Sequence, residues 1–251
     1  AEGNDEAIRS TVSWALRNVI ALSEDSVRDE SSIHHALSSR VVTADSGSSL
    51  QLAAFVAVVA TATTETALRG WLSGSLPDGM QLDLDLRWSI LVRLAVLGFS
   101  DPAELDRALA DEPTARSRVE HARATASLPE ASAKRWAWAR FTGDADVSNY
   151  ESEAAGLGMW RSGQEHLTQP YVARFFAALP GLPSVHSGWV LGTVVRSFFP
   201  FTACTQQTLD RAEAVLADES VDPTVRRNLL DQTYDLARCL AVRDQLGHEG
   251  R

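Results

Sequence analysis

The segment Leu82–Phe99 (LDLDLRWSILVRLAVLGF) constrains the fold most, because it predicts a helix that is apolar almost all the way round. Between Leu86 and Leu97 the charged interruptions are Arg87 and Arg93, whose long stems can lie along apolar surface while the guanidinium finds a carboxylate or water. Gly98 follows at the position of a left-handed helix cap. A helix without a wide polar face needs neighbours on both sides, so we expect it at the centre of a helical stack.

Charge and composition restrict the class of protein and its partners. The chain has 251 residues, of which 45% are hydrophobic, and its formal net charge is −10. These values are typical of a globular protein with a sizeable core. The negative charge argues against nucleic acid or an anionic membrane as a partner, because their phosphates would be repelled. No stretch reaches the ~20 apolar residues of a membrane span, and no signal peptide is recognisable.

Helical signals recur along the chain, and strand signals are nearly absent. Asp101-Pro102 and Asp222-Pro223 each predict a helix start, with a capping carboxylate followed by a proline whose missing N–H costs nothing. SGSLPDG (Ser73–Gly79) predicts the clearest turn. The other predicted helices follow Asn4-Asp5 or cover Val27–Arg40, Leu50–Ala62, Leu68–Leu72, Arg116–Ser127, Ala131–Phe141, Asn149 to about Gly158, Gln164–Ala178, Val185–Phe198 and Leu209–Leu216.

About a dozen helices joined by short loops predict an all-α fold, an irregular HEAT-like α-solenoid of antiparallel helix pairs. No sequence period is found, so the strict repeat families are not supported. We expect residues 1–251 to form a single helical-repeat domain.

Cys204 and Cys239 are the only cysteines. Two separated thiols without metal-ligand spacing are most simply buried small hydrophobes in a reducing compartment, and a disulfide between them is the less favoured interpretation. We therefore expect free thiols and a cytoplasmic protein.

No motif for catalysis or for metal binding is present in the chain. There is no H-E-x-x-H, no G-x-S-x-G elbow and no phosphate-binding loop, and Gly156, Gly158 and Gly163 do not follow a strand. No two histidines have the i,i+4 spacing that would place two imidazoles on one helix face. The histidines, which we interpret as surface or core residues, are His34, His35, His121, His166, His186 and His248.

Three weaker patterns each have a functional and a structural interpretation. Asp83 and Asp85 could form an acid/base pair, but carboxylates at a helix N-terminus are more often there to complement the macrodipole. Arg226-Arg227 could bind a carboxylate or pair with Asp231. Four aromatic residues could line a pocket, although core packing is favoured: Trp160, Tyr171, Phe175 and Trp189. We predict no catalytic, cofactor-binding or metal-ligating residue in this chain.

Several segments together carry a family resemblance. The longest is LRGWLSGSLPDGMQLDLDLRWSILVRLAVLG (Leu68–Gly98), with a leucine-rich helix, a Leu-Pro-Gly-type turn and an L-R-W helix. It is followed, in order, by the acidic stretch Asp101–Asp111, LPEASAKRWAW (Leu128–Trp138), Asn149–Trp160, LTQPYVARFF (Leu167–Phe176) and VRRNLLDQTYDLARCLAVRD (Val225–Asp244). This ordered set resembles the C-terminal, ERAP1-C-like helical domain of M1-family zinc aminopeptidases of the aminopeptidase N type, as found in actinobacteria. The amino-terminal third matches only as amphipathic helices.

The resemblance implies an accessory role in a larger enzyme. In such enzymes the C-terminal helices curve into a bowl over the catalytic domain and enclose the peptide substrate. The family's zinc motif, H-E-x-x-H…E, and its exopeptidase motif, G-A-M-E-N, are absent here, so no catalytic residue is carried over. The resemblance therefore implies that the chain is an excised part of a longer aminopeptidase, inactive alone and without a cofactor of its own. Its partners would be the upstream catalytic domain, which holds the zinc, and the peptide. The alternative is a free-standing HEAT-like scaffold that binds another protein.

Overall fold

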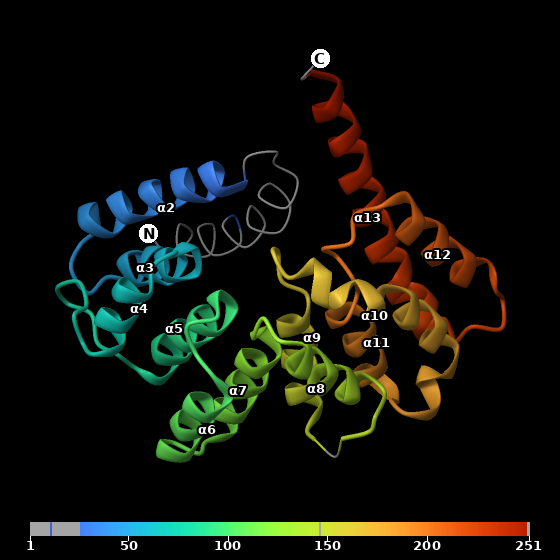
Figure 1. The fold of residues 1–251 in the computed structure, drawn as a ribbon, viewed down its shortest axis with the longest axis horizontal. Coiled ribbons are helices and arrows are strands. Elements are labelled where there is room, and N and C mark those ends of the chain that lie inside the picture. The colour runs from blue at the N-terminus through green and yellow to red at the C-terminus, as the bar shows by residue number, and fades with distance from the viewer. Residues whose placement is uncertain (1–10, 12–25, 146, 250–251) are drawn as a thin grey trace. The chain divides into compact units, whose positions relative to one another are not determined.

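The computed structural model describes residue 11, residues 26–145 and residues 147–249, and all regular structure in these residues is helical. The helix predicted after Asn4-Asp5 lies outside the described residues. Two compact units, Ala1–Ser100 and Asp101–Arg251, are each described by themselves. The helices (Figure 1) are α2 (Ser26–Thr43), α3 (Ser49–Thr61), α4 (Glu65–Leu72), α5 (Leu84–Leu97), α6 (Pro102–Asp111), α7 (Ala115–Ser127), α8 (Ala131–Phe141), α9 (Asn149–Met159), α10 (Glu165–Ala178), the 3₁₀ helix η2 (Leu179–Ser184), α11 (Gly188–Ser197), α12 (Gln206–Ala217) and α13 (Pro223–Glu249).

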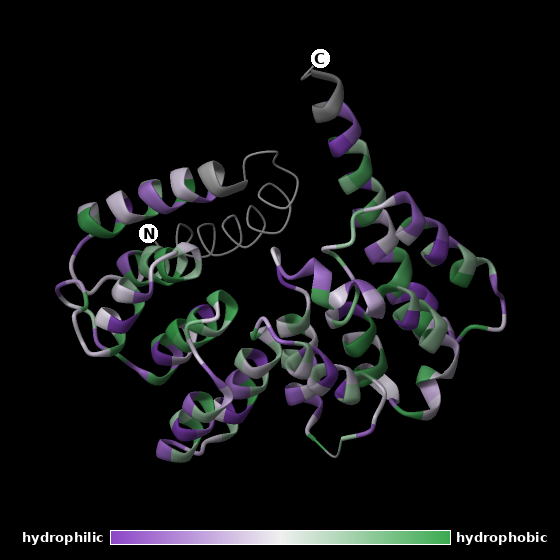
Figure 2. Cartoon of the chain, viewed as in Figure 1, coloured by the Kyte–Doolittle hydropathy of each residue, from purple (hydrophilic) through white to green (hydrophobic). Residues whose placement is uncertain are grey.

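In the described part of the first unit, α5 has two neighbouring helices. It contacts α3 and α4, and α3 in turn packs against α2. The buried residues of α5 are Leu86, Trp88, Ile90, Leu91, Leu94 and Ala95. Figure 2 shows α5 and α3 as strongly hydrophobic helices, in contrast to the mixed hydropathy of α2. The prediction that this largely apolar helix needs more than one neighbour is confirmed, and its place at the centre of the whole stack stays a prediction.

Local signals set both ends of α5. Asp83 caps the N-terminus, where its carboxylate accepts a hydrogen bond from the Leu86 N–H at 2.8 Å. Gly98 adopts a φ of 75°, the left-handed conformation in which a side chain would be strained. In that conformation the Gly98 N–H donates to the Ala95 carbonyl at 3.1 Å. The predicted cap at Gly98 is confirmed.

In the second unit, the helices pack as neighbours along the chain and one step beyond it. The helix α7 packs extensively against α9, α9 also contacts α8 and α11, and α13 contacts α11 and α12. The cap-plus-proline starts are confirmed: Asp101 accepts from the Glu104 N–H at 2.8 Å, and Asp222 accepts from the Thr224 N–H at 2.7 Å.

Two helices of the second unit begin elsewhere than predicted. The expected helix Val185–Phe198 is shorter, because α11 begins only at Gly188, after the separate 3₁₀ helix η2 at Leu179–Ser184. The expected helix Leu209–Leu216 is longer, because Thr205 caps α12 by accepting from the Thr208 N–H at 3.2 Å. Both errors are at helix starts, where a cap or a short helical turn decides the boundary.

Candidate functional site

A recurring polar feature of the described residues is a set of cations that bind the C-terminal ends of neighbouring helices. The helices α3, α7 and α12 carry no basic residue in their own last turns. Their end carbonyls, which carry the negative end of the helix dipole, are bound from an adjacent helix instead. These donors, defined here as the cross-helix caps, are Arg93 to Ala62, Lys134 to Ala126 and Arg226 to Asp218. Arg69 binds the Phe99 carbonyl, which lies beyond the Gly98 cap of α5.

Arg93 shows how such a cap is built. Its Nε donates to the Ala62 carbonyl at 2.6 Å, and its Nη2 lies 2.8 Å from Glu30 Oε1 on α2. One guanidinium therefore joins α2, α3 and α5. Burial lowers the pKa of Arg93, and the neighbouring Glu30 carboxylate partly opposes this effect. The prediction that an arginine of this helix would find a carboxylate is confirmed for Arg93.

Lys134 is the most deeply buried cation of the described residues. It is the only lysine among the 23 Lys and Arg residues, and its side chain is fully buried. Its Nζ donates to the Ala126 carbonyl at 2.7 Å. The next carbonyl, that of Ser127, accepts from Gln164 Nε2 at 3.0 Å, and Arg161 Nε lies 3.1 Å from Ser127 Oγ. The end of α7 is thus held by groups from α8 and from the segment after α9.

Burial lowers the pKa of Lys134 to about 7, with a smaller contribution from the positive charge of Arg161. In some enzymes a lysine that is neutral near physiological pH acts as a nucleophile. The side chain of Lys134 is fully buried, so a substrate in solvent does not reach it. We therefore assign Lys134 to helix capping. The sequence signal was the occurrence of a single lysine in a chain otherwise rich in arginine, which our sequence interpretation did not use.

Replacing Lys134 with methionine is expected to change how stability depends on pH. The pKa of Lys134 in the folded protein, about 7, lies below its ordinary value of 10.5, so between these values the unfolded chain binds more protons. The free energy of unfolding therefore rises with pH across this window. From about pH 7 to about pH 9, wild type should gain about 2 kcal/mol relative to K134M in urea unfolding. If the free energy of unfolding had the same pH dependence in both proteins, the pKa of Lys134 would not be lowered by folding.

The described histidines are held by hydrogen bonds or exposed. His34 Nδ1 lies 2.9 Å from Thr61 Oγ1. The Thr61 hydroxyl donates its proton to the Ala57 carbonyl, so its oxygen accepts a hydrogen bond from the imidazole N–H. Burial lowers the pKa of His34. His121 pairs with Asp106, His186 bonds the Phe141 carbonyl, and His35 and His166 are exposed. The side chain of His248 lies outside the described residues.

The weaker patterns of the sequence also have structural roles where the model describes them. Asp83 caps α5 and Asp85 lies in its first turn, as the macrodipole interpretation predicts. Arg226 binds the Asp218 carbonyl at 2.9 Å, which is neither of the two predicted roles. Among the described residues, no three His, Cys, Asp or Glu side chains are grouped so as to hold a metal ion.

The four aromatic candidates do not lie together on one surface. Trp160, Tyr171 and Phe175 are buried as predicted, and the indole N–H of Trp160 donates to the Phe198 carbonyl at 2.8 Å. The interpretation of Trp189 as a core residue is wrong, because 58% of it is exposed. It lies in the first turn of α11 against the ring of Tyr150, itself 61% exposed, with 5.8 Å between ring centroids. Sequence analysis missed Tyr150, which lies in the first turn of α9 between Ser148 and Glu151, the two residues of a capping box.

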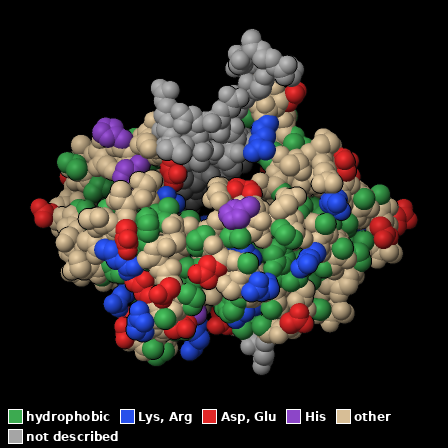
Figure 3. Space-filling view, in the orientation of Figure 1, with side chains coloured by type: hydrophobic (Ala, Val, Ile, Leu, Met, Phe, Trp, Pro, Cys, Tyr) green, Lys and Arg blue, Asp and Glu red, His purple; other side chains and the backbone are tan. Residues whose placement is uncertain are grey.

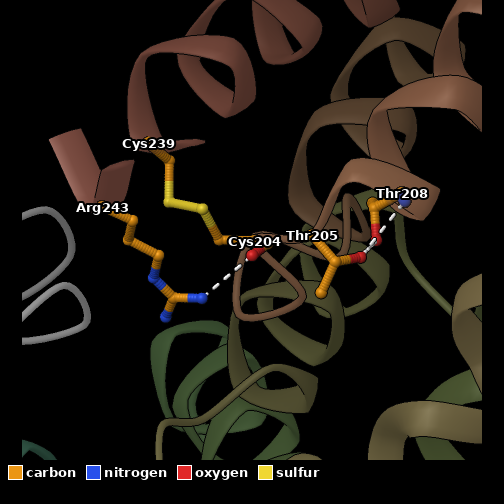
Figure 4. The surroundings of a disulfide bond; sticks show 5 residues. All are labelled: Cys204, Thr205, Thr208, Cys239 and Arg243. Carbon is orange, nitrogen blue, oxygen red and sulfur yellow. Dashed lines mark hydrogen bonds between the residues drawn. A yellow bond between two sulfur atoms is a disulfide. The ribbon is translucent and has the colours of Figure 1, made fainter. Parts of the chain in front are cut away.

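The prediction of two free thiols is wrong. Cys204 and Cys239 form a disulfide with their Cα atoms 6.3 Å apart (Figure 4). The pairing depends on tertiary structure, because the loop between α11 and α12 lies against α13, 35 residues away in sequence. Spacing along the chain could not reveal this proximity.

The surface carries charges of both signs. On the face drawn in Figure 3, acidic and basic side chains are interspersed with hydrophobic ones. Within the described residues, no helix combines the length and the apolar character that crossing a bilayer requires.

Comparison with known proteins agrees with the family resemblance. The sequence model of the ERAP1-like C-terminal domain matches residues 16–238, and so begins well before Leu68, where our resemblance begins. Aminopeptidase N of Streptomyces lividans is 29% identical over 201 residues, which cover 78% of this chain. The chain spans 24% of the length of that protein. From the extent of the family match, this chain belongs to the ERAP1-like C-terminal domain family.

Proposed function

We propose that this chain is the C-terminal, substrate-enclosing domain of an M1-type zinc aminopeptidase, and that its two units together form one HEAT-like helical domain. The observation that carries the proposal is the family match over residues 16–238, together with a relative named aminopeptidase N of which the chain spans 24%. In such an enzyme the zinc and the catalytic residues belong to the upstream domain of the same polypeptide. This chain contributes walls that limit which peptides reach the zinc.

The side-chain chemistry supports a wall in place of a reactive centre. The half-buried Arg93 and the buried Lys134 bind helix-end carbonyls, and the buried indole of Trp160 binds a backbone carbonyl. Each of these groups stabilises the packing of one helix on another. Rigid helices of this kind give a substrate chamber a fixed outline.

A second candidate function is that of a free-standing scaffold for another protein. The exposed pair of Tyr150 and Trp189 favours it, because exposed aromatic side chains are common anchors at protein interfaces. The coding sequence upstream of this chain distinguishes the two proposals. The aminopeptidase proposal requires H-E-x-x-H and G-A-M-E-N upstream of this chain, and their absence there would favour the scaffold.

We expect the isolated chain to have no aminopeptidase activity. The test is hydrolysis of alanine and leucine anilides with added zinc, by the isolated chain and by the full gene product. The full gene product should hydrolyse the anilide and lose this activity with a chelator, while the chain alone should stay at the background rate. Turnover by the isolated chain that survives purification and disappears with chelator would contradict its assignment as an accessory domain.

The substrate-enclosing role has its own test in the full gene product. Peptides of increasing length with the same N-terminal residue should be cleaved up to a limit, and a folded protein with that N-terminus should be resistant. Equal rates for the short peptide and for the folded protein would leave the aminopeptidase assignment intact and remove the enclosing role.

The cytoplasmic location stays a prediction, and the disulfide removes its original basis. Disulfides persist mainly in oxidising compartments, and cytosolic ones are usually catalytic or redox-sensing. Fractionation of the source cells, with thiols alkylated at lysis, measures both the compartment and the state of Cys204 and Cys239.

A further inference from the structure

The helix α13 presents large apolar side chains on two opposite faces. One face is buried in the second unit and contains Val225, Leu229 and Leu236. Leu230 and Tyr234, in contrast, are 59% and 66% exposed. Because successive residues of an α-helix turn by about 100°, these two side chains lie opposite the buried face. The described helices of the second unit therefore leave this face of α13 uncovered.

The exposed apolar residues of α13 have the spacing of a coiled-coil seam. We define the outer stripe as Leu230, Tyr234, Ala237 and Ala241, all of them exposed and spaced four, three and four residues apart. Alternate steps of three and four residues keep side chains on one narrow line, along which a second helix can pack. In Figure 1 the C-terminal end of α13 extends past the other helices of the second unit. The outer stripe is thus suited to a helical partner.

Two charges beside the outer stripe indicate which helix fits it. Asp231 and Arg238 are both exposed and seven residues apart, and therefore lie on the same side of the stripe. Tyr234 lies between them, three residues after Asp231 and four before Arg238. When two such helices run antiparallel and meet near Tyr234, Asp231 of each copy lies beside Arg238 of the other. In a parallel pair these side chains lie at opposite edges of the seam and do not meet.

We propose that the outer stripe binds a second copy of this chain, with two α13 helices packed antiparallel about a two-fold axis near Tyr234. The same surface is then used on both copies, as a two-fold dimer requires. Leu230 and Tyr234 supply the apolar contact, and the two Asp231–Arg238 pairs fix the direction and the register of the helices. The proposal does not depend on the aminopeptidase assignment, because it uses residues of α13 alone.

The dimer is expected to be weak. Contact along a few turns of one helix per copy buries less than the total of about 1,200–2,000 Å² that is typical of stable interfaces. The net charge of −10 on each chain also opposes association. We therefore expect a dissociation constant on the order of 10 μM or above.

Sedimentation velocity of the full gene product, between about 1 and 300 μM protein, tests the interface. The wild type should pass from monomer to dimer over this range. Asp231→Arg and Arg238→Asp should each raise the dissociation constant at least about tenfold, because two attractive pairs become repulsive. The double variant Asp231→Arg/Arg238→Asp should restore the wild-type value, since the pairs are present again with exchanged signs.

Two further variants locate the surface. Tyr234→Asp should remain monomeric, because it places like charges on both sides of the two-fold axis. Its exposed position should leave the helical content unchanged in circular dichroism. Tyr150→Ser, the matched control, removes an exposed aromatic ring from α9 and should dimerise as the wild type does.

Four results would overturn the proposal. The first is a full gene product that stays monomeric throughout the concentration range. The second is a Tyr234→Asp protein that dimerises like the wild type, and the third is loss of the dimer in Tyr150→Ser, which would mean that another surface forms the contact. The fourth is a double charge variant as weak as the two single ones, because antiparallel pairing requires the rescue.

Discussion

Replacing Gly158 with valine should lower the free energy of unfolding by about 3 kcal/mol, because it forces apart two helices in contact. A Cβ atom at Gly158 would lie 2.4 Å from the Arg123 carbonyl oxygen and 2.8 Å from the Ala126 Cβ. Backbone atoms of α7 cannot move aside as the end of a flexible side chain can. The effect should appear as a lower denaturation midpoint in urea, with α7 and α9 less protected from hydrogen exchange.

Gly70→Ala is the matched control for this prediction. Gly70 is also helical, in α4, but a Cβ there would meet no atom within 4 Å. The substitution should therefore stabilise the protein by about 0.5–1 kcal/mol, through reduced freedom of the unfolded chain. If Gly158→Val and Gly70→Ala had the same sign and size of effect, the close approach of α7 and α9 would be refuted.

Removing the disulfide should be the other large perturbation. The double variant Cys204→Ser/Cys239→Ser opens a loop with a sequence separation of 35 residues, and the chain-entropy model puts the loss near about 4 kcal/mol. The native fold should survive, because folded domains usually have about 5–15 kcal/mol of stability. Thermal unfolding of the double variant should match that of reduced wild type.

The same experiment contains its own check. Adding reductant should lower the unfolding temperature of wild type and leave the double variant unchanged. A wild-type protein whose midpoint does not respond to reductant would show that the cysteines are not bonded in solution.

The parts of the fold that sequence analysis predicted well are those set by neighbouring residues. The helix α5 follows from its own apolar run between Asp83 and Gly98, and both caps act within four residues. The starts of α6 and α13 follow from an aspartate and a proline side by side. Signals of this kind need no knowledge of the rest of the molecule.

What the sequence could not indicate depends on contacts between distant segments. The pairing of Cys204 with Cys239 requires the loop before α12 to lie on α13. Trp189 is exposed because it occupies the outer side of the first turn of α11, and its residue type alone favoured burial. Lys134 caps a carbonyl of another helix, so no pattern of neighbouring residues predicts its role.

In the candidate site, too, sequence analysis predicted the local features and missed those that depend on contacts between separate segments. The interpretation of Asp83 and Asp85 as N-terminal helix carboxylates was correct because it is a local property. The role of Arg226 was not found, since its acceptor, the Asp218 carbonyl, lies across a turn on α12. Family membership was accessible because it rests on ordered segments and not on any single contact.

The cross-helix caps have a consequence for cooperativity. When α5 frays near Arg93, the Ala62 carbonyl at the end of α3 loses that donor, and when α8 frays near Lys134, the Ala126 carbonyl of α7 loses its donor. Unfolding of one helix therefore destabilises the adjacent helix of the same unit, so that neighbouring helices unfold cooperatively. Proteolysis that requires one of these helices to unfold locally is therefore slower, because its neighbour must be destabilised at the same time.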